Sequence, residues 1–191
     1  MSRLLRQTAL RFSDRTALVN IERNRRFTFW EMHELTNKLC HVIKDKFGLG
    51  EGDVYATLLE NDNMGLFHFW MTKSPATALW LDIRESVEEQ LNQIDHVQPH
   101  LIFIEPRLLS QYYEHLRDRD ISIVCMDKGD EVLPGVSYYW ELLEGASALD
   151  PSMAYAADDV EQHVCLLKFT GGTTGRGKCH VFPVKYFEPG L

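Results

Sequence analysis

Apolar residues fall along the chain in two alternating patterns. Short continuous runs, which have the length of β-strands, occupy residues 16–21, 25–29, 53–59, 76–81, 100–104, 121–126 and 163–169. Between most of these runs, the apolar residues are spaced as on one face of a helix. Strands that alternate with helices predict an α/β fold with a largely parallel β-sheet and flanking helices.

Two of the predicted helices have clear start signals. Thr28 and Glu31 form a capping-box pattern before an apolar stripe of helical period, which ends near Gly48. Residues 82–85 show a second capping pattern before a helix that Pro99 ends. Residues 127–162 are acidic and turn-rich. Further helices are predicted at residues 1–12, 64–73, 106–117 and 139–143.

The composition is that of an ordinary soluble globular protein, since the 191 residues are 45% hydrophobic and 25% charged. The formal net charge of −8 argues against non-specific nucleic-acid binding, which needs a cationic surface. No apolar run approaches the roughly 20 residues of a membrane span, so we expect no transmembrane segment. The four cysteines contain no Cys-x-x-Cys pair, which predicts neither a zinc site nor a disulfide framework and favours the reducing cytoplasm.

Positive charge is concentrated at the N-terminus. Residues 1–26 hold seven arginines against Asp14 and Glu22, a balance of +5. Two interpretations stay open: a mitochondrial transit peptide, or a helix docked on the body of the protein. The low hydroxyl content and the uninterrupted continuation into the first strand favour the docked helix.

The most informative stretch follows the last predicted strand. It holds four glycines, three threonines, one arginine and one lysine in nine residues, Thr170-Gly171-Gly172-Thr173-Thr174-Gly175-Arg176-Gly177-Lys178. Glycine lets the backbone approach a ligand closely, and successive N–H groups form a concavity that suits an anion. Threonine hydroxyls add donors, and the lysine adds a positive charge. These groups meet the needs of a polyphosphate, while the plain alternative is a Gly/Thr hairpin turn.

A Walker A loop is a competing interpretation of the same stretch. Residues 172–178 fit the first seven positions of that pattern. However, Cys179 stands where the Mg²⁺-binding Ser or Thr belongs, and a thiol is a poor Mg²⁺ ligand. The segment that follows is β-like and contains Pro183, whereas a Walker loop opens a helix. Cys179 beside Lys178 also suggests a reactive thiolate, which would need a lowered pKa.

Residues 170–178 resemble the signature loop of the adenylate-forming superfamily, which includes acyl-CoA synthetases, luciferases and adenylation domains of peptide synthetases. That loop typically reads Ser/Thr-Ser/Gly-Gly-Ser/Thr-Ser/Thr-Gly-x-Pro-Lys-Gly. Gly177 and Cys179 depart from it, in place of Pro and the final Gly. Weaker marks follow in the family's order: Asp14-Arg15-Thr16-Ala17-Leu18, Phe27-Thr28-Phe29-Trp30-Glu31, Gly52-Asp53-Val54 with Asn61, and Gln98-Pro99-His100.

The resemblance implies an ATP-dependent acid–thiol ligase that activates a carboxylic acid as an acyl-adenylate with Mg²⁺, and then passes the acyl group to CoA. The double glycine leans toward fatty-acyl-CoA and aryl-acid ligases, and so toward fatty acid metabolism. No residue of the chain is assigned as catalytic or as a metal ligand. The resemblance implies that the β- and γ-phosphates of ATP are bound by Thr170, Gly171, Gly172, Thr173, Thr174, Gly175 and Lys178.

Much of the family's machinery has no counterpart in residues 1–191. Its adenine-site motif, Mg²⁺-associated Glu, ribose-binding Asp and C-terminal domain with a catalytic Lys are not recognised there. We therefore expect a partial N-terminal AMP-binding domain, which is inactive alone and self-associates through an exposed sheet edge. The alternative is a stand-alone non-catalytic module that binds a nucleotide or a partner chain.

Overall fold

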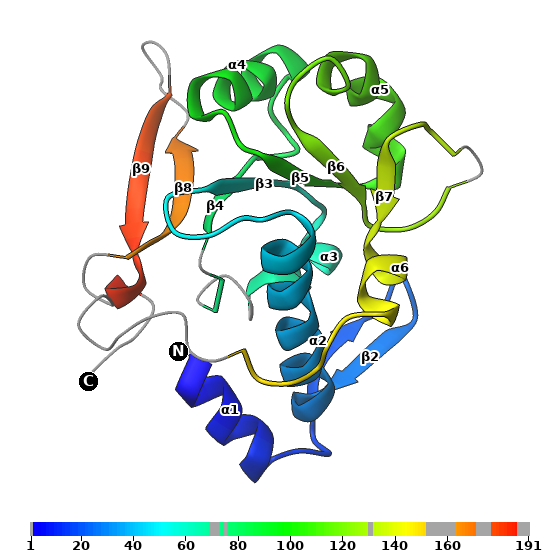
Figure 1. Cartoon of the computed structure of the whole chain (residues 1–191), viewed down its shortest axis with the longest axis vertical. Coiled ribbons are helices and arrows are strands. Elements are labelled where there is room, and N and C mark those ends of the chain that lie inside the picture. The colour runs from blue at the N-terminus through cyan, green and yellow to red at the C-terminus, as the bar shows by residue number, and fades with distance from the viewer. Residues whose placement is uncertain are drawn as a thin grey trace.

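Seven strands form the main sheet, and most of them are the apolar runs that the sequence predicts. The computed structural model describes residues 2–68, 73–74, 76–129, 132–151, 163–170 and 177–186 (Figure 1). The elements follow the order α1 (Ser2–Arg11), β1 (Thr16–Asn20), β2 (Arg25–Thr28), α2 (Phe29–His41), η1 (Val42–Lys46), β3 (Val54–Leu58), α3 (Asn61–His68), β4 (Thr77–Trp80), α4 (Val87–Val97), β5 (Leu101–Ile104), α5 (Pro106–Leu116), β6 (Ser122–Cys125), β7 (Val136–Tyr138), α6 (Tyr139–Glu144), β8 (Val164–Thr170), β9 (Lys178–Pro183) and η3 (Val184–Tyr186).

The main sheet has the strand order β7-β6-β5-β3-β4-β8-β9, and every neighbouring pair except β8–β9 is parallel. From β3 the chain adds β4 on one side and then reverses to add β5, β6 and β7 on the other. The carboxyl ends of the parallel strands meet along one edge of the sheet. At such a reversal α/β proteins commonly bind ligands at this edge. The predicted α/β class with a largely parallel sheet is confirmed.

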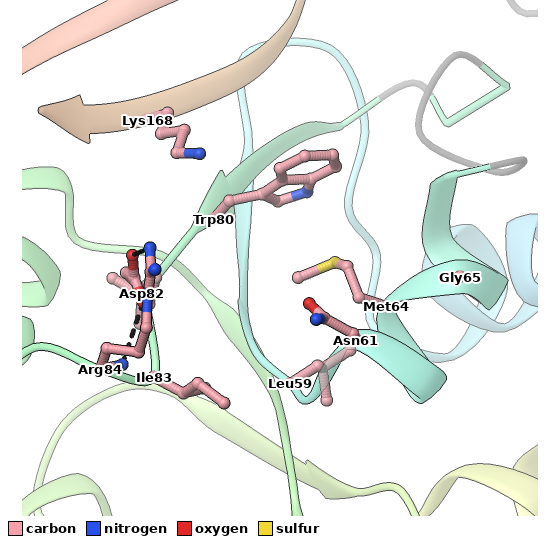
Figure 2. A pocket seen from close by; sticks show the side chains of 10 residues that line it. Leu59, Asn61, Met64, Gly65, Trp80, Asp82, Ile83, Arg84 and Lys168 are labelled. Atoms are coloured by element: carbon pink, nitrogen blue, oxygen red, sulfur yellow. Dashed lines mark hydrogen bonds and ion pairs between the residues drawn. The ribbon is translucent and has the colours of Figure 1, made fainter.

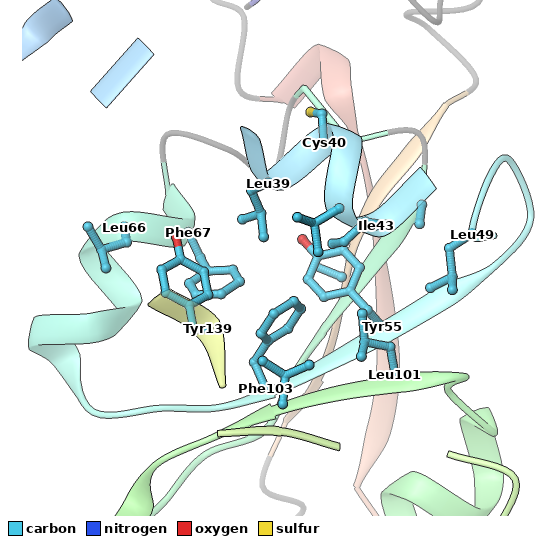
Figure 3. Packing of buried hydrophobic residues seen from close by; sticks show 14 of the residues in the cluster. Leu39, Cys40, Ile43, Leu49, Tyr55, Leu66, Phe67, Leu101, Phe103 and Tyr139 are labelled. Atoms are coloured by element: carbon cyan, nitrogen blue, oxygen red, sulfur yellow. The ribbon is translucent and has the colours of Figure 1, made fainter. Parts of the chain in front are cut away.

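Helices cover both faces of the sheet. On one face, α2, α3 and α6 contribute Leu39, Phe67 and Tyr139 to a core cluster with strand residues Tyr55 and Phe103 (Figure 3). The rings of Phe67 and Phe103 lie 4.9 Å apart, and Tyr55 meets Phe103 edge to face at 6.0 Å. Burial on both faces explains why the strands read as continuous apolar runs. On the other face, α4 and α5 pack a second cluster that includes Ile94, Leu109 and Leu116.

Local signals explain how the first long helix begins. The hydroxyl of Thr28 accepts a hydrogen bond from the backbone N–H of Glu31 at 3.2 Å, and the Glu31 carboxylate accepts one from the backbone N–H of Thr28 at 2.7 Å. The predicted capping box is therefore confirmed. Helix α1 contacts α2 and buries Leu5 and Ala9, as the docked-helix interpretation predicts. None of the helices in the described part of the chain has the length and apolar content that a membrane crossing requires.

Three local predictions differ from the structure. Helix α4 begins after Ser86, whose hydroxyl accepts from the backbone N–H of Glu89 at 3.2 Å, and not after Asp82. Both Asp82 and Ser86 stand three residues before an acid, so the pattern alone could not choose between them. The helix expected at residues 64–73 begins earlier, at Asn61. Strand β7 is not predicted, because its three residues carry too short a pattern.

Candidate functional site

The glycine- and threonine-rich loop joins the last two strands of the sheet. Strands β8 and β9 pair antiparallel, and Thr170 and Lys178 are Cα partners at the base of the loop. Both residues are exposed. Because β8 runs parallel to β4, the loop leaves the sheet at the shared carboxyl edge. The other predicted phosphate-binding residues lie outside the described residues: Gly171, Gly172, Thr173, Thr174 and Gly175.

Gly177 closes the base of the loop through a close backbone approach. A Cβ atom at this position would lie 2.7 Å from the carbonyl oxygen of Thr170, which is too close for a real Cβ contact. Glycine, in place of the family's usual Pro, therefore has a steric reason in this chain. The close approach holds Lys178 directly across from Thr170.

The structure decides two of the alternatives raised by the sequence. The Walker A interpretation is wrong, because Lys178 begins strand β9 and not a helix. The loop is a hairpin connection in its topology, while its anion-binding role stays a prediction. The thiolate interpretation of Cys179 is not supported, because partial burial raises the pKa of this thiol.

A cavity of about 490 Å³ lies at the same edge of the sheet (Figure 2). Its walls come from the turn after β3, the start of α3, the end of β4 with the turn that follows, and β8. Trp80 of β4 and Lys168 of β8 are Cα partners on neighbouring parallel strands. The pairing of β4 with β8 therefore brings together side chains that are distant in the sequence. The apolar part of the lining includes Leu59, Met64, Trp80 and Ile83.

The charged groups of the cavity are two cations and one carboxylate. Arg84 binds Asp82 in a bidentate manner, with an Nε–Oδ1 distance of 2.9 Å and a second hydrogen bond from Nη2 to Oδ2. The hydrogen bond from Arg84 is the main reason that the pKa of Asp82 is lowered to about 2. Lys168 is exposed, and no described residue forms a hydrogen bond or an ion pair with it. The charge of Lys168 also helps to lower the pKa of Asp82, although Lys168 makes no hydrogen bond to this acid.

A second polar cluster lies beside β3 and β5, where the strand order reverses. Arg23, from the turn between β1 and β2, donates to Asp62, Glu105 and Asp127, with an Nη2–Oε2 distance of 2.7 Å to Glu105. The side chain of Glu105 is 1% exposed and also accepts from the backbone N–H of Glu60 at 3.0 Å. Burial raises the pKa of Glu105, although its hydrogen bonds and the charge of Arg23 act to lower it.

The same cluster has carboxylate spacing that could suit a metal ion. Oxygens of Glu60, Asp62 and Glu105 lie within 4.8 Å of one another. Arg23 donates to two of these groups, and its Nη2 lies 3.8 Å from the carboxylate of Glu60. The guanidinium thus supplies the positive charge that a metal would bring. The arrangement is an internal ion network that fixes the β1–β2 hairpin and the turn after β3 to the edge of the sheet.

The sequence does not single out Trp80 or Lys168 as site residues. Only their positions in the sequence could have indicated them. Lys168 interrupts an otherwise apolar strand two residues before Thr170, and Trp80 ends another apolar strand. Such residues become meaningful only once the strand order is known, because three strands and three helices of the described chain separate β4 from β8 in the sequence.

Comparison with known proteins identifies the family. The model of the family described as AMP-binding enzyme matches residues 5–186. The chain belongs to this family of AMP-binding enzymes. Long-chain fatty acid transport protein 6 of Mus musculus is 24% identical over 157 residues, which cover 81% of this chain and 25% of that protein. The chain therefore spans about a quarter of the length of this relative.

Solved structures of AMP-binding enzymes share the fold. The anthranilate CoA ligase AuaEII, in complex with anthranoyl-AMP, matches with a TM-score of 0.81 and 16% identity, over 96% of this chain and 34% of that one. A fatty acyl CoA synthetase of Mycobacterium tuberculosis matches with a TM-score of 0.73 and 18% identity, over 96% of this chain and 34% of that one. At such identities the likeness shows the fold alone. The resemblance inferred from the loop and the weaker motifs is confirmed by the family match.

Proposed function

We propose that the protein to which this chain belongs uses ATP to activate a carboxylic acid and then transfers the acyl group to the thiol of CoA. A carboxylate oxygen attacks the α-phosphorus, the bond from that phosphorus to the oxygen bridging to the β-phosphate breaks, and pyrophosphate leaves. The thiolate sulfur then attacks the acyl carbon, and AMP leaves with the electrons of the broken bond. Family membership is the observation that carries this proposal.

The loop between β8 and β9 would stabilise the leaving pyrophosphate. Negative charge grows on the bridging oxygen during the first step, and preorganised N–H and hydroxyl donors with a lysine disperse it. The exposed Thr170 and Lys178, held across from each other at the base of the loop, support this role. The proposed phosphate-binding set is Thr170, Gly171, Gly172, Thr173, Thr174, Gly175 and Lys178.

The carboxylates that lie at the carboxyl edge of the sheet, in the cavity and in the cluster around Arg23, do not fit a Mg²⁺ ion held by the chain. Asp82 is engaged by Arg84, and the cluster of Glu60, Asp62 and Glu105 is engaged by Arg23. We propose that Mg²⁺ arrives bound to the phosphates of ATP. We also propose a reducing compartment such as the cytoplasm, because all four cysteines are free thiols.

Titration of ATP into the purified chain tests the phosphate site. A charge-assisted hydrogen bond is worth about 1.5–3 kcal/mol, so Lys178→Ala should weaken ATP binding by about 10- to 150-fold. Lys185→Ala is the matched control, because Lys185 is an exposed lysine just after β9. We expect the control to change the affinity by less than about twofold. Equal affinities for the wild type and Lys178→Ala would refute the assignment.

A second experiment addresses catalysis. We propose that residues 1–191 alone do not complete the reaction, since the family's adenine and catalytic-lysine motifs are not recognised in them. Exchange of labelled pyrophosphate into ATP, measured with a panel of carboxylic acids, should show no turnover for this chain. Turnover would contradict the proposal. ATP binding without turnover would agree with it.

A further inference from the structure

We propose that His33 makes the docking of α1 on α2 sensitive to pH, so that protonation of its imidazole ring releases α1. Helix α1 packs against α2 and buries Leu5 and Ala9 (Figure 1). His33 belongs to α2 and is 4% exposed. Release of α1 would require neither ATP nor the proposed reaction.

Helix α2 is buried on two of its faces. Met32 and Leu39 lie on the apolar face and belong to the core cluster on the sheet. The second buried face is polar and carries His33, Thr36 and Asn37. These residues are three and four positions apart, so they lie next to one another on the helix. Polar side chains that are buried in this way need partners from neighbouring elements.

Lys73 and the segment after α6 supply most of these partners. The Lys73 side chain is 4% exposed, and its ammonium group donates to the amide oxygen of Asn37 and to the hydroxyl of Thr36 at 3.4 Å. The Asn37 amide donates to the carbonyl oxygen of Ala148 at 2.9 Å, where the segment after α6 crosses α2 (Figure 1). Asp150 of this segment has a carboxylate oxygen 3.9 Å from the Lys73 Nζ.

Helix α1 adds a second cation to this cluster. The Nε atom of Arg6 lies 3.4 Å from a carboxylate oxygen of Asp150. Arg6 and Lys73 therefore share one carboxylate. The His33 ring lies 5.5 Å from the ring of Trp30, and its Nδ1 atom is buried without a hydrogen-bond partner among the described residues. His33 is thus a buried and incompletely satisfied imidazole in a cluster that already holds two positive charges.

A proton on His33 would be costly while α1 is docked. The imidazolium donates from both ring nitrogens, and its buried Nδ1–H would lack an acceptor in the described part of the chain. Burial lowers the pKa of His33, and the charge of Lys73 lowers it further. Asp150 and Glu34 act to raise this pKa, whereas Arg6 acts to lower it. The docked state therefore disfavours the proton.

Undocking of α1 relieves this cost. It removes the charge of Arg6 and gives water access to the side of α2 that α1 covers. The undocked state then binds the proton more nearly as a free imidazole does, with a pKa of about 6.5. Docking is unaffected well above this pH and weakens as the pH falls below it. One proton changes the equilibrium by at most about tenfold per pH unit, so we expect the undocked fraction to rise about three- to tenfold between about pH 7.5 and about pH 5.5.

Amide hydrogen exchange of the full chain at these two pH values tests the proposal. The rate of each amide is divided by its intrinsic rate at the same pH, which leaves the opening equilibrium. We expect protection in the second half of α1 to fall about three- to tenfold at the lower pH. The amides of α5 should keep their protection, because a local release of α1 does not unfold the sheet and its other helices.

Substitution of His33 separates its protonation from other effects of pH. His33→Gln keeps a polar side chain that cannot take up a proton, so α1 should be equally protected at both pH values. His33→Leu serves the same purpose if the first variant does not melt cooperatively. His115→Gln is the matched control, because His115 is an exposed histidine on α5. We expect this control to retain the wild-type response of α1.

Three results would overturn the proposal. The first is equal protection of α1 at the two pH values in the wild type. The second is a response to pH that persists in His33→Gln or His33→Leu. The third is a parallel loss of protection in α1 and α5, which would show global unfolding in place of the release of one helix.

Discussion

Removal of Arg23 should destabilise the protein strongly, because this residue is the cation that pairs with the buried Glu105. The side chain of Glu105 is 1% exposed and that of Arg23 is 22% exposed, so Arg23→Ala leaves a buried carboxylate without its cation. Removing one partner of a buried pair costs about 3–5 kcal/mol, and the partial exposure of Arg23 places the loss near about 3 kcal/mol. For a chain of this size that corresponds to a fall in Tm of roughly 6–12 °C.

The loss should depend on pH in a defined direction. Burial raises the pKa of Glu105 in the folded protein, and Arg23 opposes that rise. An acid with a raised folded pKa stabilises the fold below its unfolded pKa, and this contribution is lost as pH rises through the folded pKa. Without Arg23 the folded pKa is higher still. The difference in unfolding free energy between Arg23→Ala and the wild type should therefore grow with pH, by at most about 1.4 kcal/mol per pH unit for one group.

Asp62 acts in the same direction. Burial acts to raise its pKa, but hydrogen bonds from Arg23 and other donors leave that pKa lowered. A lowered pKa gives stability that is present above the unfolded pKa and lost as pH falls through the folded pKa. Loss of Arg23 removes part of this contribution at neutral pH and little of it in acid. The contribution of Asp62 changes mainly below its ordinary pKa of 3.8, so the larger effect that we expect at about pH 7.5 than at about pH 5 rests on Glu105.

Urea denaturation of the wild type and variants at these two pH values provides the measurement. Arg26→Ala is the control, because the Arg26 side chain is exposed and hydrogen-bonds only to Thr16 among the described residues; we expect a change within about 0.5 kcal/mol. Adding Glu105→Gln to Arg23→Ala should restore stability at the higher pH, because it removes the uncompensated charge. The same loss for Arg23→Ala at both pH values, with no rescue by Glu105→Gln, would refute this reasoning.

Three further predictions follow from local contacts. Gly177→Ala should destabilise the β8–β9 hairpin by roughly 1–3 kcal/mol, because its Cβ would lie 2.7 Å from the Thr170 carbonyl oxygen; Gly145→Ala, with no atom within 4 Å of the added Cβ, should change unfolding free energy by less than about 1 kcal/mol. Thr28→Ala should lower the free energy of unfolding, measured by thermal melting, by about 1 kcal/mol, and Thr28→Ser should recover most of this loss. Equal stability of the wild type and Thr28→Ala would contradict a stabilising role of the capping box. Val181 is 54% exposed on the edge strand β9, so Val181→Lys should reduce self-association in sedimentation velocity; a wild type that stays monomeric at high concentration would contradict the proposed edge pairing.

The elements that the sequence predicts well are those with strong local signals. The capping box of Thr28 and Glu31 lies within one helical turn, and the buried strands are recognisable in the sequence as continuous apolar runs. The start of α4 is ambiguous, because Asp82 and Ser86 offer the same local pattern and only the tertiary structure decides between them. Signals of short range can locate an element, but two equivalent signals leave its boundary open.

The polar sites depend on contacts that no local pattern contains. Arg23 meets carboxylates that are 39, 82 and 104 residues away in the sequence. The cavity needs the parallel pairing of β4 with β8, which places Trp80 beside Lys168. The β8–β9 loop is different, because its predicted phosphate-binding groups lie in nine consecutive residues. The sequence alone is therefore enough to predict this site.

The proposed function depends on the binding of phosphate by backbone N–H groups of the β8–β9 loop. The most direct measurement is the shift of backbone amide resonances when inorganic pyrophosphate is added to the ¹⁵N-labelled chain. We expect the largest saturable shifts at Gly171–Gly175, and we expect Lys178→Ala to reduce them greatly at the same pyrophosphate concentration. Shifts centred elsewhere in the chain, or shifts in the loop that Lys178→Ala leaves intact, would contradict this role of the loop.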